Sequence, residues 1–325
     1  MKAIIPVAGM GSRLRPHTYT LPKVMLSVAG KPIIGHIFDK LIEDGITEAT
    51  VIIGYMGEVI EKYLRSHYSI PIDFVEQTEL LGLGHSIWVA QRTFSDTEPV
   101  FIILGDTIFD VDLKKVFNSK DSSLGVKYVE DPRRFGVAEV ENGVIKKLIE
   151  KPEKPTSHLA MVGLYYITKP ALLKESLNYL VENNVRTKNE YQLTDALQRM
   201  IEGGHTFTTF NVEGWYDCGK PETLLSTNQV LLSMKAEKAE LTGSVVIPPV
   251  FIHPSAQITH SVIGPNASIG ENAVIKNSVI RNSIIGSEAR VDATLLEESI
   301  VGNGALIAGR FRRVNVGDMT ELDFK

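Results

Sequence analysis

The feature that most constrains the fold of this chain is a short apolar repeat in its last third. Apolar, mostly β-branched residues recur there at steps of five or six: Ile252, Ile258, Ile263, Ile269, Ile275, Ile280, Ile285, Val291, Leu296, Val301 and Ile307. Repeats this short cannot bury an apolar face alone and must stack, so the pattern predicts a parallel β-helix with three short faces per coil. Residues 312–325 lack the repeat, and we expect them to cover the open end of the coils.

A different rhythm runs through the residues before the repeat. Short β-branched runs at residues 3–7, 50–53, 72–75 and 100–104 alternate with longer amphipathic stretches at 33–44, 58–66 and 84–94. This order predicts parallel strands connected by helices, with helices on both sides of the sheet. From 125 to 167 the pattern changes to strands separated by turns, which indicates an insertion or an antiparallel edge beside the main sheet. Helices are expected again at 171–183, 194–202 and 221–240.

Composition excludes several classes of protein. The chain has 325 residues, 43% of them hydrophobic, which is enough to close a sizeable core. Its net charge of −5 argues against a nucleic-acid partner but leaves room for a local phosphate site. The single cysteine, Cys218, cannot form an internal disulfide, and no apolar run reaches about 18 residues. We therefore expect a cytoplasmic protein without a membrane or targeting segment.

A glycine-rich turn directly follows the first predicted strand. Gly9 and Gly11 would let backbone N–H groups approach a phosphate, and Arg13 would add charge-assisted hydrogen bonds. Lys23 supplies a second cation ten residues later, so that the pair could bracket a polyphosphate. The turn matches neither the Walker loop nor the dinucleotide fingerprint, and by itself a structural turn explains it equally well.

Two carboxylates occupy comparable positions. Asp106 follows the buried run at 100–104, and Asp217 lies in an aromatic-flanked turn before a predicted helix. Either aspartate alone is better explained as a turn or cap residue. Together, near a triphosphate, they suggest Mg²⁺, which binds a few carboxylates plus phosphate oxygens and water.

In chain order these motifs resemble those of the sugar-1-phosphate nucleotidyltransferases, most closely the glucose-1-phosphate thymidylyltransferases and their uridylyl relatives. The matching segments are residues 9–14, 22–23, 76–77, 81–85, 104–106, 135–139, 149–152, 162–165, 190–195 and 215–219. The resemblance implies a Rossmann-like catalytic domain with a mostly parallel sheet at residues 1–240. It also implies a short left-handed parallel β-helix of hexapeptide repeats at 241–325.

The resemblance also implies a Mg²⁺-dependent reaction. A sugar phosphate oxygen attacks the α-phosphorus of a nucleoside triphosphate, and pyrophosphate leaves. Residue by residue, it assigns catalysis to Arg13, Lys23 and Lys151, nucleotide binding to Ala8, Gly9, Gly11, Ser12, Gln77 and Gly82, sugar binding to Gly136, Glu150 and Gly163, and the metal to Asp106 and Asp217.

The choice of substrate stays open at this stage. The resemblance favours dTTP and glucose-1-phosphate. However, Ala8 before the glycine turn and Val24 after Lys23 depart from the short thymidylyltransferases, and residues 81–85 also resemble uridylyltransferases. UTP, and other sugar-1-phosphates, are therefore alternatives.

Two other classes compete with this interpretation. Hexapeptide-repeat proteins include acyltransferases with a histidine base, and His253 and His260 lie in the repeat, although no long loop interrupts it. The same two-part architecture resembles regulatory subunits, but these characteristically lose the catalytic cations and carboxylates that this chain retains. In either case the apolar repeat leads us to expect a homo-oligomer.

Overall fold

The computed structural model describes residues 1–234 and 241–309. Its chain divides into two compact units, one of residues 1–27 and 31–227 and the other of 28–30 and the residues from 228 onward. The predicted domain boundary after residue 240, the predicted end of the last helix at 240 and the tail at 312–325 fall on or beside residues outside the described ranges. They stay predictions.

The first unit is built on a nine-stranded mixed sheet with the order β5-β4-β1-β6-β11-β8-β12-β10-β9. Its parallel half contains β1 (Lys2–Pro6), β4 (Glu48–Ile53), β5 (Ile72–Glu76) and β6 (Val100–Ile103). Ala3, Ile4 and Ile5 of β1 are fully buried, as expected for a central strand covered on both faces. The predicted parallel sheet is therefore confirmed.

The other half of this sheet contains the strands that follow residue 120. They are β8 (Ser122–Tyr128), β9 (Gly136–Glu141), β10 (Val144–Glu150), β11 (Leu159–Ile167) and β12 (Phe207–Asn211). β11 runs antiparallel to β6 through a register that pairs Leu164 with Ile103. The antiparallel strands thus continue the main sheet rather than forming a separate insertion beside it.

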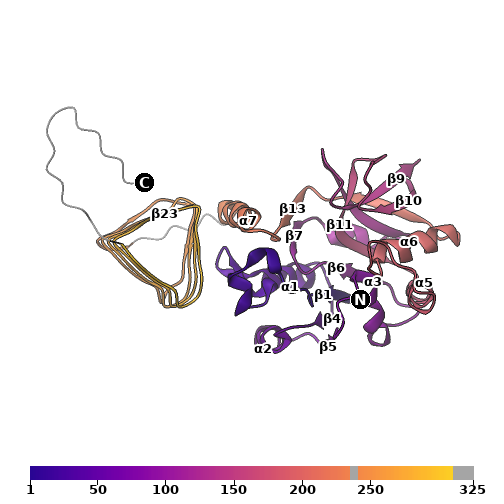
Figure 1. Ribbon diagram of the computed structural model, residues 1–325, viewed down its shortest axis with the longest axis horizontal. Helices are drawn as coiled ribbons and strands as arrows, with labels where there is room; N and C mark the ends of the chain where they lie inside the picture. The colour runs from indigo at the N-terminus through magenta and orange to yellow at the C-terminus, as the bar shows by residue number, and fades with distance from the viewer. Residues whose placement is uncertain (235–240, 310–325) are drawn as a thin grey trace. The chain divides into compact units, whose positions relative to one another are not determined.

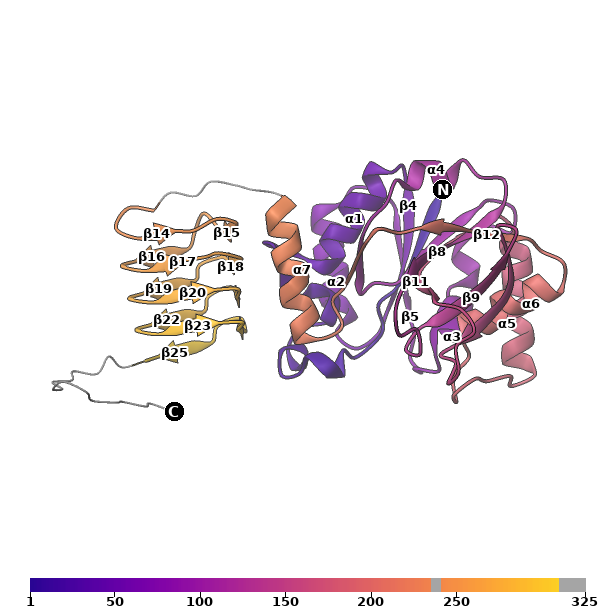
Figure 2. The same ribbon diagram turned by 90° about the horizontal axis from the view of Figure 1, so that it is seen from above.

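Helices cover both faces of the sheet. Their bounds are α1 (Ile33–Glu43), α2 (Gly57–His67), α3 (Leu83–Val89), α4 (Leu113–Phe117), α5 (Pro170–Glu182), α6 (Leu193–Glu202) and α7 (Pro221–Met234). Figure 2 shows α1 and α2 on one side of the sheet and α3, α5 and α6 on the other. The predicted helix at 84–94 is shorter than expected, because a 3₁₀ turn at Gln91–Thr93 replaces its second half. No helix of the described residues is long and apolar enough to cross a bilayer.

The remaining short elements before α7 are three 3₁₀ turns and four strands. They are the 3₁₀ turns η1 (Ser12–Leu14), η2 (His17–Tyr19) and η3 (Lys23–Met25) and the strands β2 (Ser27–Val28), β3 (Lys31–Pro32), β7 (Thr107–Asp110) and β13 (Gly214–Asp217). β13 pairs antiparallel with β7. This pairing brings the segment around Asp217 next to the segment that follows Asp106.

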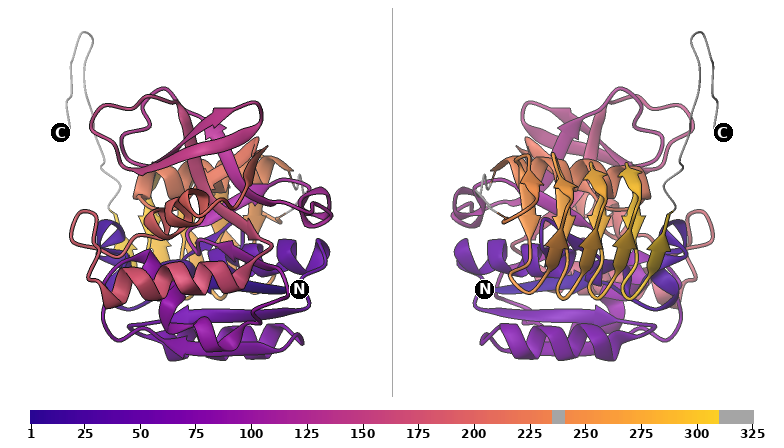
Figure 3. Two further views of the ribbon diagram at one scale, coloured as in Figure 1. Left: turned by 90° about the vertical axis from the view of Figure 1, so that its right-hand side faces the viewer. Right: turned by 90° about the vertical axis from the view of Figure 1, so that its left-hand side faces the viewer.

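The second unit contains the predicted β-helix, with three parallel four-stranded sheets as its faces. One sheet contains β14 (Val245–Val246), β17 (Val262–Ile263), β20 (Val279–Arg281) and β23 (Leu295–Glu297). The second contains β15 (Val250–Ile252), β18 (Ala267–Ile269), β21 (Ile284–Ile285) and β24 (Ile300–Val301), and the third β16 (Gln257–Thr259), β19 (Val274–Lys276), β22 (Arg290–Asp292) and β25 (Leu306–Ala308). Figure 1 shows the coils end-on as a triangle, and Figure 3 shows their parallel strands.

The repeat residues form the core of this β-helix. Ile263, Ile269, Ile275 and Ile280 are fully buried. The register stacks Ile252 on Ile269 and Ile269 on Ile285, so like side chains lie above one another from coil to coil. This architecture is consistent with the left-handed β-helix expected from the sequence.

Candidate active site

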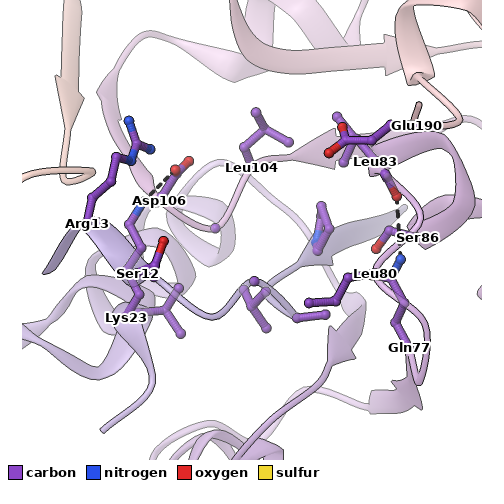
Figure 4. Close-up of a pocket in the computed structure, with 18 residues that line it drawn as sticks. Ser12, Arg13, Lys23, Gln77, Leu80, Leu83, Ser86, Leu104, Asp106 and Glu190 are labelled. Carbon is purple, nitrogen blue, oxygen red and sulfur yellow. Dashed lines mark hydrogen bonds and ion pairs between the residues drawn. The ribbon is translucent and has the colours of Figure 1, made fainter. Parts of the chain in front are cut away.

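A pocket of about 590 Å³ lies in the first unit, where β1, β5 and β6 end. Ligands of open α/β sheets bind at this edge, and the volume suits a small-molecule ligand. The lining residues are Pro6, Val7, Ala8, Gly9, Gly11, Ser12, Arg13, Lys23, Val24, Gln77, Leu80, Gly82, Leu83, Ser86, Leu104, Gly105, Asp106 and Glu190. All residues predicted to bind the nucleotide are thus gathered in one cavity (Figure 4).

The glycine-rich turn forms one wall of the pocket. Gly11 has a φ of +61°, and a Cβ placed on it would lie 2.9 Å from Lys23 Cβ. Thr18 donates its hydroxyl to the Gly11 carbonyl at 2.9 Å. The turn is therefore packed tightly against Lys23, and a side chain at Gly11 would push the two segments apart.

Charged side chains gather beside this turn. Lys23 Nζ lies 2.6 Å from Asp106 Oδ2, and the Lys23 side chain is only 11% exposed. Figure 4 shows Arg13, Lys23 and Asp106 together at one end of the pocket. No ion pair of Arg13 occurs within residues 1–234 and 241–309, so its guanidinium is available for an anion. A phosphate chain at this end would meet two cations and one carboxylate.

Asp217 does not line the pocket, but it lies near this charged end. Its Oδ1 accepts a hydrogen bond of 2.8 Å from the Gly219 N–H. A Cβ on Gly219 would lie 2.8 Å from Asp217 Oδ1 and 3.1 Å from Arg13 Nη2. The Cys218 N–H also donates to the Asp106 carbonyl at 3.1 Å. The two predicted metal ligands are thus on adjoining segments, with Asp217 close to Arg13.

Gln77 and Gly82 form the opposite end of the pocket. Gln77 directly follows β5, and its amide Nε2 lies 3.4 Å from the Gly82 carbonyl. Gly82 has a φ of +110°, and a Cβ there would lie 2.7 Å from the Tyr191 carbonyl. The Tyr191 N–H donates to the Leu81 carbonyl at 2.8 Å. The loop after β5 is therefore held against the segment that precedes α6.

The residues predicted to bind the sugar form a neighbouring group outside the lining of this pocket. Lys151 Nζ pairs with Glu150 Oε1 at 3.0 Å, and Thr194 donates to Glu150 Oε2 at 2.7 Å. Gly136 stands opposite Glu150 in the β9–β10 register. Gly163 connects this group to the pocket, because its carbonyl accepts from the N–H of the pocket residue Leu104 at 3.0 Å.

Tyr165 of β11 is a buried phenol. Burial is the main reason that the pKa of Tyr165 lies above its ordinary value, and the nearby charges of Glu150 and Asp106 raise it further.

Comparisons with known proteins agree with this geometry. A family model described as nucleotidyl transferase matches residues 2–234, and one described as the GMPPB C-terminal domain matches residues 246–318. The chain belongs to the nucleotidyl transferase family. It is a sugar-1-phosphate nucleotidyltransferase, as the motifs implied.

Individual relatives of this nucleotidyltransferase span both of its units. The low-salt glycan biosynthesis nucleotidyltransferase Agl11 of Haloferax volcanii is 34% identical over 99% of each chain. A glucose-1-phosphate thymidylyltransferase of Streptomyces antibioticus is 28% identical over 100% of each chain. The crystal structure of a UDP-glucose pyrophosphorylase with UDP-glucose has a TM-score of 0.61 and 27% identity, covering 72% of this chain and 98% of that one.

The donors of the nucleotidyltransferase fit Mg²⁺ better than a metal held by protein ligands alone. No group of three or more His, Cys, Asp or Glu side chains within the described ranges could hold a metal ion. Asp106, whose side chain is 35% exposed, and Asp217 offer hard oxygen ligands near the charged end. Mg²⁺ commonly uses one or two carboxylates and completes its shell with phosphate oxygens and water.

Eight lining side chains were absent from the predicted site: Pro6, Val7, Val24, Leu80, Leu83, Ser86, Leu104 and Glu190. Ser86 is 3% exposed, and its Oγ has no hydrogen-bond partner among the described residues. Glu190 belongs to a motif that carried the family resemblance, which is the signal that could have found it. Ser86 had no such signal, since only the turn of α3 directs it into the pocket.

The remaining polar candidates have ordinary structural partners. His253 Nδ1 lies 2.8 Å from Ser255 Oγ, and His260 occupies a turn with a φ of +48°. Cys218 is fully buried, and burial raises the pKa of its thiol to about 12. A thiol that stays protonated is a poor nucleophile, which fits a packing role.

Proposed function

We propose that this nucleotidyltransferase transfers a nucleotidyl group from a pyrimidine nucleoside triphosphate, with dTTP favoured, to glucose-1-phosphate. The products would be the nucleoside diphosphate glucose and pyrophosphate. The observation that carries the proposal is the polarity of the pocket: Arg13, Lys23 and Asp106 lie at one end, and the Gln77 amide lies at the other. A nucleotide has the matching polarity, with phosphates at one end and a base at the other.

The charged end would bind the triphosphate. Backbone groups of Ala8, Gly9, Gly11 and Ser12 would surround the phosphates, and Arg13 would stabilise the departing pyrophosphate. Lys23 would contact the reacting phosphates once its ion pair with Asp106 opens. Transfer at phosphorus depends mainly on in-line placement and charge neutralisation, which these groups provide without a covalent intermediate.

Mg²⁺ would be held by Asp106 and Asp217 together with phosphate oxygens. When bound, it would neutralise phosphate charge and make the α-phosphorus more electrophilic. Asp106 has a second role that follows from its position: its ion pair keeps Lys23 near the phosphate site.

The sugar phosphate would bind beside the pocket. Lys151 would hold its phosphate, and Glu150, Gly136 and Gly163 would contact the sugar. Thr194 supports Glu150 from α6, which fixes the carboxylate and, through it, the ammonium group of Lys151. A phosphate oxygen of the sugar would then attack the α-phosphorus, and the bond between the α-phosphorus and the oxygen bridging to the β-phosphate would break.

UTP is the second candidate donor. The UDP-glucose pyrophosphorylase structure is similar to 72% of this chain, and the loop at residues 81–85 resembles uridylyltransferases. A pocket that reads the base through Gln77 and Gly82 would accept both uracil and thymine, which differ only by a methyl group.

Product analysis tests the proposal. The purified chain would be incubated with Mg²⁺, glucose-1-phosphate and either dTTP or UTP, and the products separated by ion-exchange chromatography. We expect dTDP-glucose or UDP-glucose in amounts equal to the pyrophosphate released. Pyrophosphate without a sugar nucleotide would contradict the glucose-1-phosphate assignment, and the absence of both would favour another sugar phosphate or a regulatory role.

A further inference from the structure

The Gln77 side chain is buried and held in one orientation. It is 5% exposed, and its Nε2 contacts two acceptors, the Gly82 carbonyl at 3.4 Å and His85 Nδ1 at 3.2 Å. A carbonyl oxygen can only accept, so the NH₂ group of the amide must face Gly82. No hydrogen bond reaches Gln77 Oε1 within the described part of the chain, although Gln77 lines the pocket. The amide oxygen is therefore the group left to meet a ligand.

The His85 ring is fixed by aromatic neighbours. It is 7% exposed and stacks on Trp88 and on Tyr191, with ring centroids 5.6 Å and 6.2 Å away. The Tyr191 hydroxyl donates to Asn184 Oδ1 at 2.9 Å, and the Arg186 guanidinium lies over the Tyr191 ring. These ring contacts hold the plane of the imidazole, and the 3.2 Å contact with Gln77 Nε2 places Nδ1 on the Gln77 side of the ring.

Burial also favours the neutral form of His85. Desolvation lowers the pKa of His85, and the nearby Arg186 lowers it further, whereas Glu79 raises it through its charge and a backbone hydrogen bond. Burial is the largest of these effects, so the net pKa lies below the ordinary value. A neutral imidazole has one nitrogen that accepts, and Nδ1 beside an NH₂ group must be that nitrogen.

We propose that His85 is a positioning residue for base selection, which holds the Gln77 amide so that Oε1 accepts the N3–H of uracil or thymine. Cytosine has an unprotonated N3 that can only accept, so it would place two acceptors opposite each other. The pocket would thus select bases with an imide N–H and reject cytosine. This inference rests on the proposed function, because it assumes that a pyrimidine nucleotide occupies the pocket.

Two matched variants test the inference. His85→Phe keeps an aromatic ring for the stack and removes the acceptor, whereas His85→Asn places an amide oxygen near the position of Nδ1. The affinities of the full chain for dTTP, UTP and CTP would be measured by isothermal titration calorimetry with Mg²⁺. Melting temperatures would show that both variants fold.

The expected readout is the ratio of the CTP to the UTP dissociation constant. We expect His85→Phe to lower this ratio by about three- to tenfold, the value of one hydrogen bond, and His85→Asn to stay within about twofold of the wild type. The inference would be overturned if His85→Phe left this ratio unchanged, or if both variants lowered the ratio equally.

A measurement on the wild type keeps the inference testable should the variants fail to fold. Nitrogen-15 NMR of the histidine ring distinguishes the two neutral tautomers. An unprotonated Nδ1 and a protonated Nε2 at His85 would support the inference, and a protonated Nδ1 would overturn it. Failure of the proposed function would be seen in a different measurement, because the wild type would then make no sugar nucleotide from dTTP or UTP. The NMR result would still report on the His85–Gln77 pair.

Discussion

Asp106 has two partners in this account, Lys23 in the free protein and a divalent cation in the reacting complex. Asp106→Asn keeps the shape of the side chain and removes the charge on which both partners depend. We expect Asp106→Asn to lower the rate of pyrophosphate release by at least about 100-fold, because an amide would bind less tightly the divalent cation that neutralises the phosphate charge. The measurement is a continuous pyrophosphate assay at saturating substrates.

The matched control for this variant is Asp112→Asn. Asp112 is exposed, lies outside the lining of the pocket and pairs with Lys115 at 3.4 Å. We expect its rate to equal that of the wild type. Undiminished pyrophosphate release in Asp106→Asn would remove Asp106 from the metal site.

Single residues also show how far the sequence could predict the site. Lys23, Gln77 and Asp106 could be placed in the pocket because each follows a recognisable strand or motif. The Glu150–Thr194 and Gln77–His85 hydrogen bonds could not, because each depends on how two side chains approach after the sheet and helices have packed. Spacing along a chain reveals which end of a strand a residue occupies, but not the rotamer of its partner.

At the scale of elements, the loop between β5 and α3 depends on Gly82. Its φ is +110°, and a Cβ at this position would lie 2.7 Å from the Tyr191 carbonyl, which leaves no room for a side chain. We expect Gly82→Ala to distort the loop and to weaken dTTP or UTP binding by roughly tenfold, about 1.4 kcal/mol. Calorimetric titration would measure the change.

Gly45→Ala is the control for the loop variant. Gly45 has a similar φ of +99°, but a Cβ there would meet nothing within 4 Å. It therefore carries a comparable backbone strain without the clash and lies outside the pocket lining. If Gly82→Ala bound the nucleotide as tightly as Gly45→Ala, the loop would not shape the base site.

A further prediction concerns the packing of side chains in the core of the β-helix. Ile275 is fully buried in β19 and stacks between Ile258 and Val291. We expect Ile275→Ala to lower the free energy of unfolding of the β-helix by about 2–5 kcal/mol, and Ile275→Val by about 0.5–1.5 kcal/mol. Urea titration followed by circular dichroism would measure both. Equal effects of the two substitutions would contradict close packing in the coils.

Elements with a regular apolar repeat could be predicted from the sequence. The positions of strands that pair with strands far away in the chain could not. The stacked coils follow from steps of five or six residues, since each coil must repeat the buried face of the last. The position of β12 does not follow from the sequence in this way. It pairs in parallel with β8, about 80 residues earlier, and its register matches Phe207 to Ser122. Nothing local in the chain determines that pairing.

At the scale of the whole molecule, we expect the β-helix to mediate self-association. The sheet β14-β17-β20-β23 aligns Val245, Val262, Val279 and Leu295, and the outermost pair, Val245 and Leu295, are 56% and 64% exposed. A column of aliphatic side chains on a regular sheet favours burial against another surface. Light scattering should give a mass that is a multiple of 35.9 kDa. A monomeric mass at micromolar concentration would contradict this expectation.

The sequence predicts two parts because the apolar period changes near residue 241. The division within the structure is less simple, since residues 28–30 group with the second unit. An apolar repeat describes only the segment in which it occurs. It could not predict that residues 28–30 group with the unit that begins at residue 228.

A panel of nucleotides tests whether the pocket binds a pyrimidine nucleoside triphosphate. Pyrophosphate release would be measured with Mg²⁺ and glucose-1-phosphate, adding dTTP, UTP, dATP, ATP, GTP and CTP separately. We expect rapid release with dTTP or UTP, and much slower release with CTP and the purine nucleotides. Preference for a purine nucleotide, or equal rates with CTP and UTP, would contradict a pocket that reads a pyrimidine imide through Gln77.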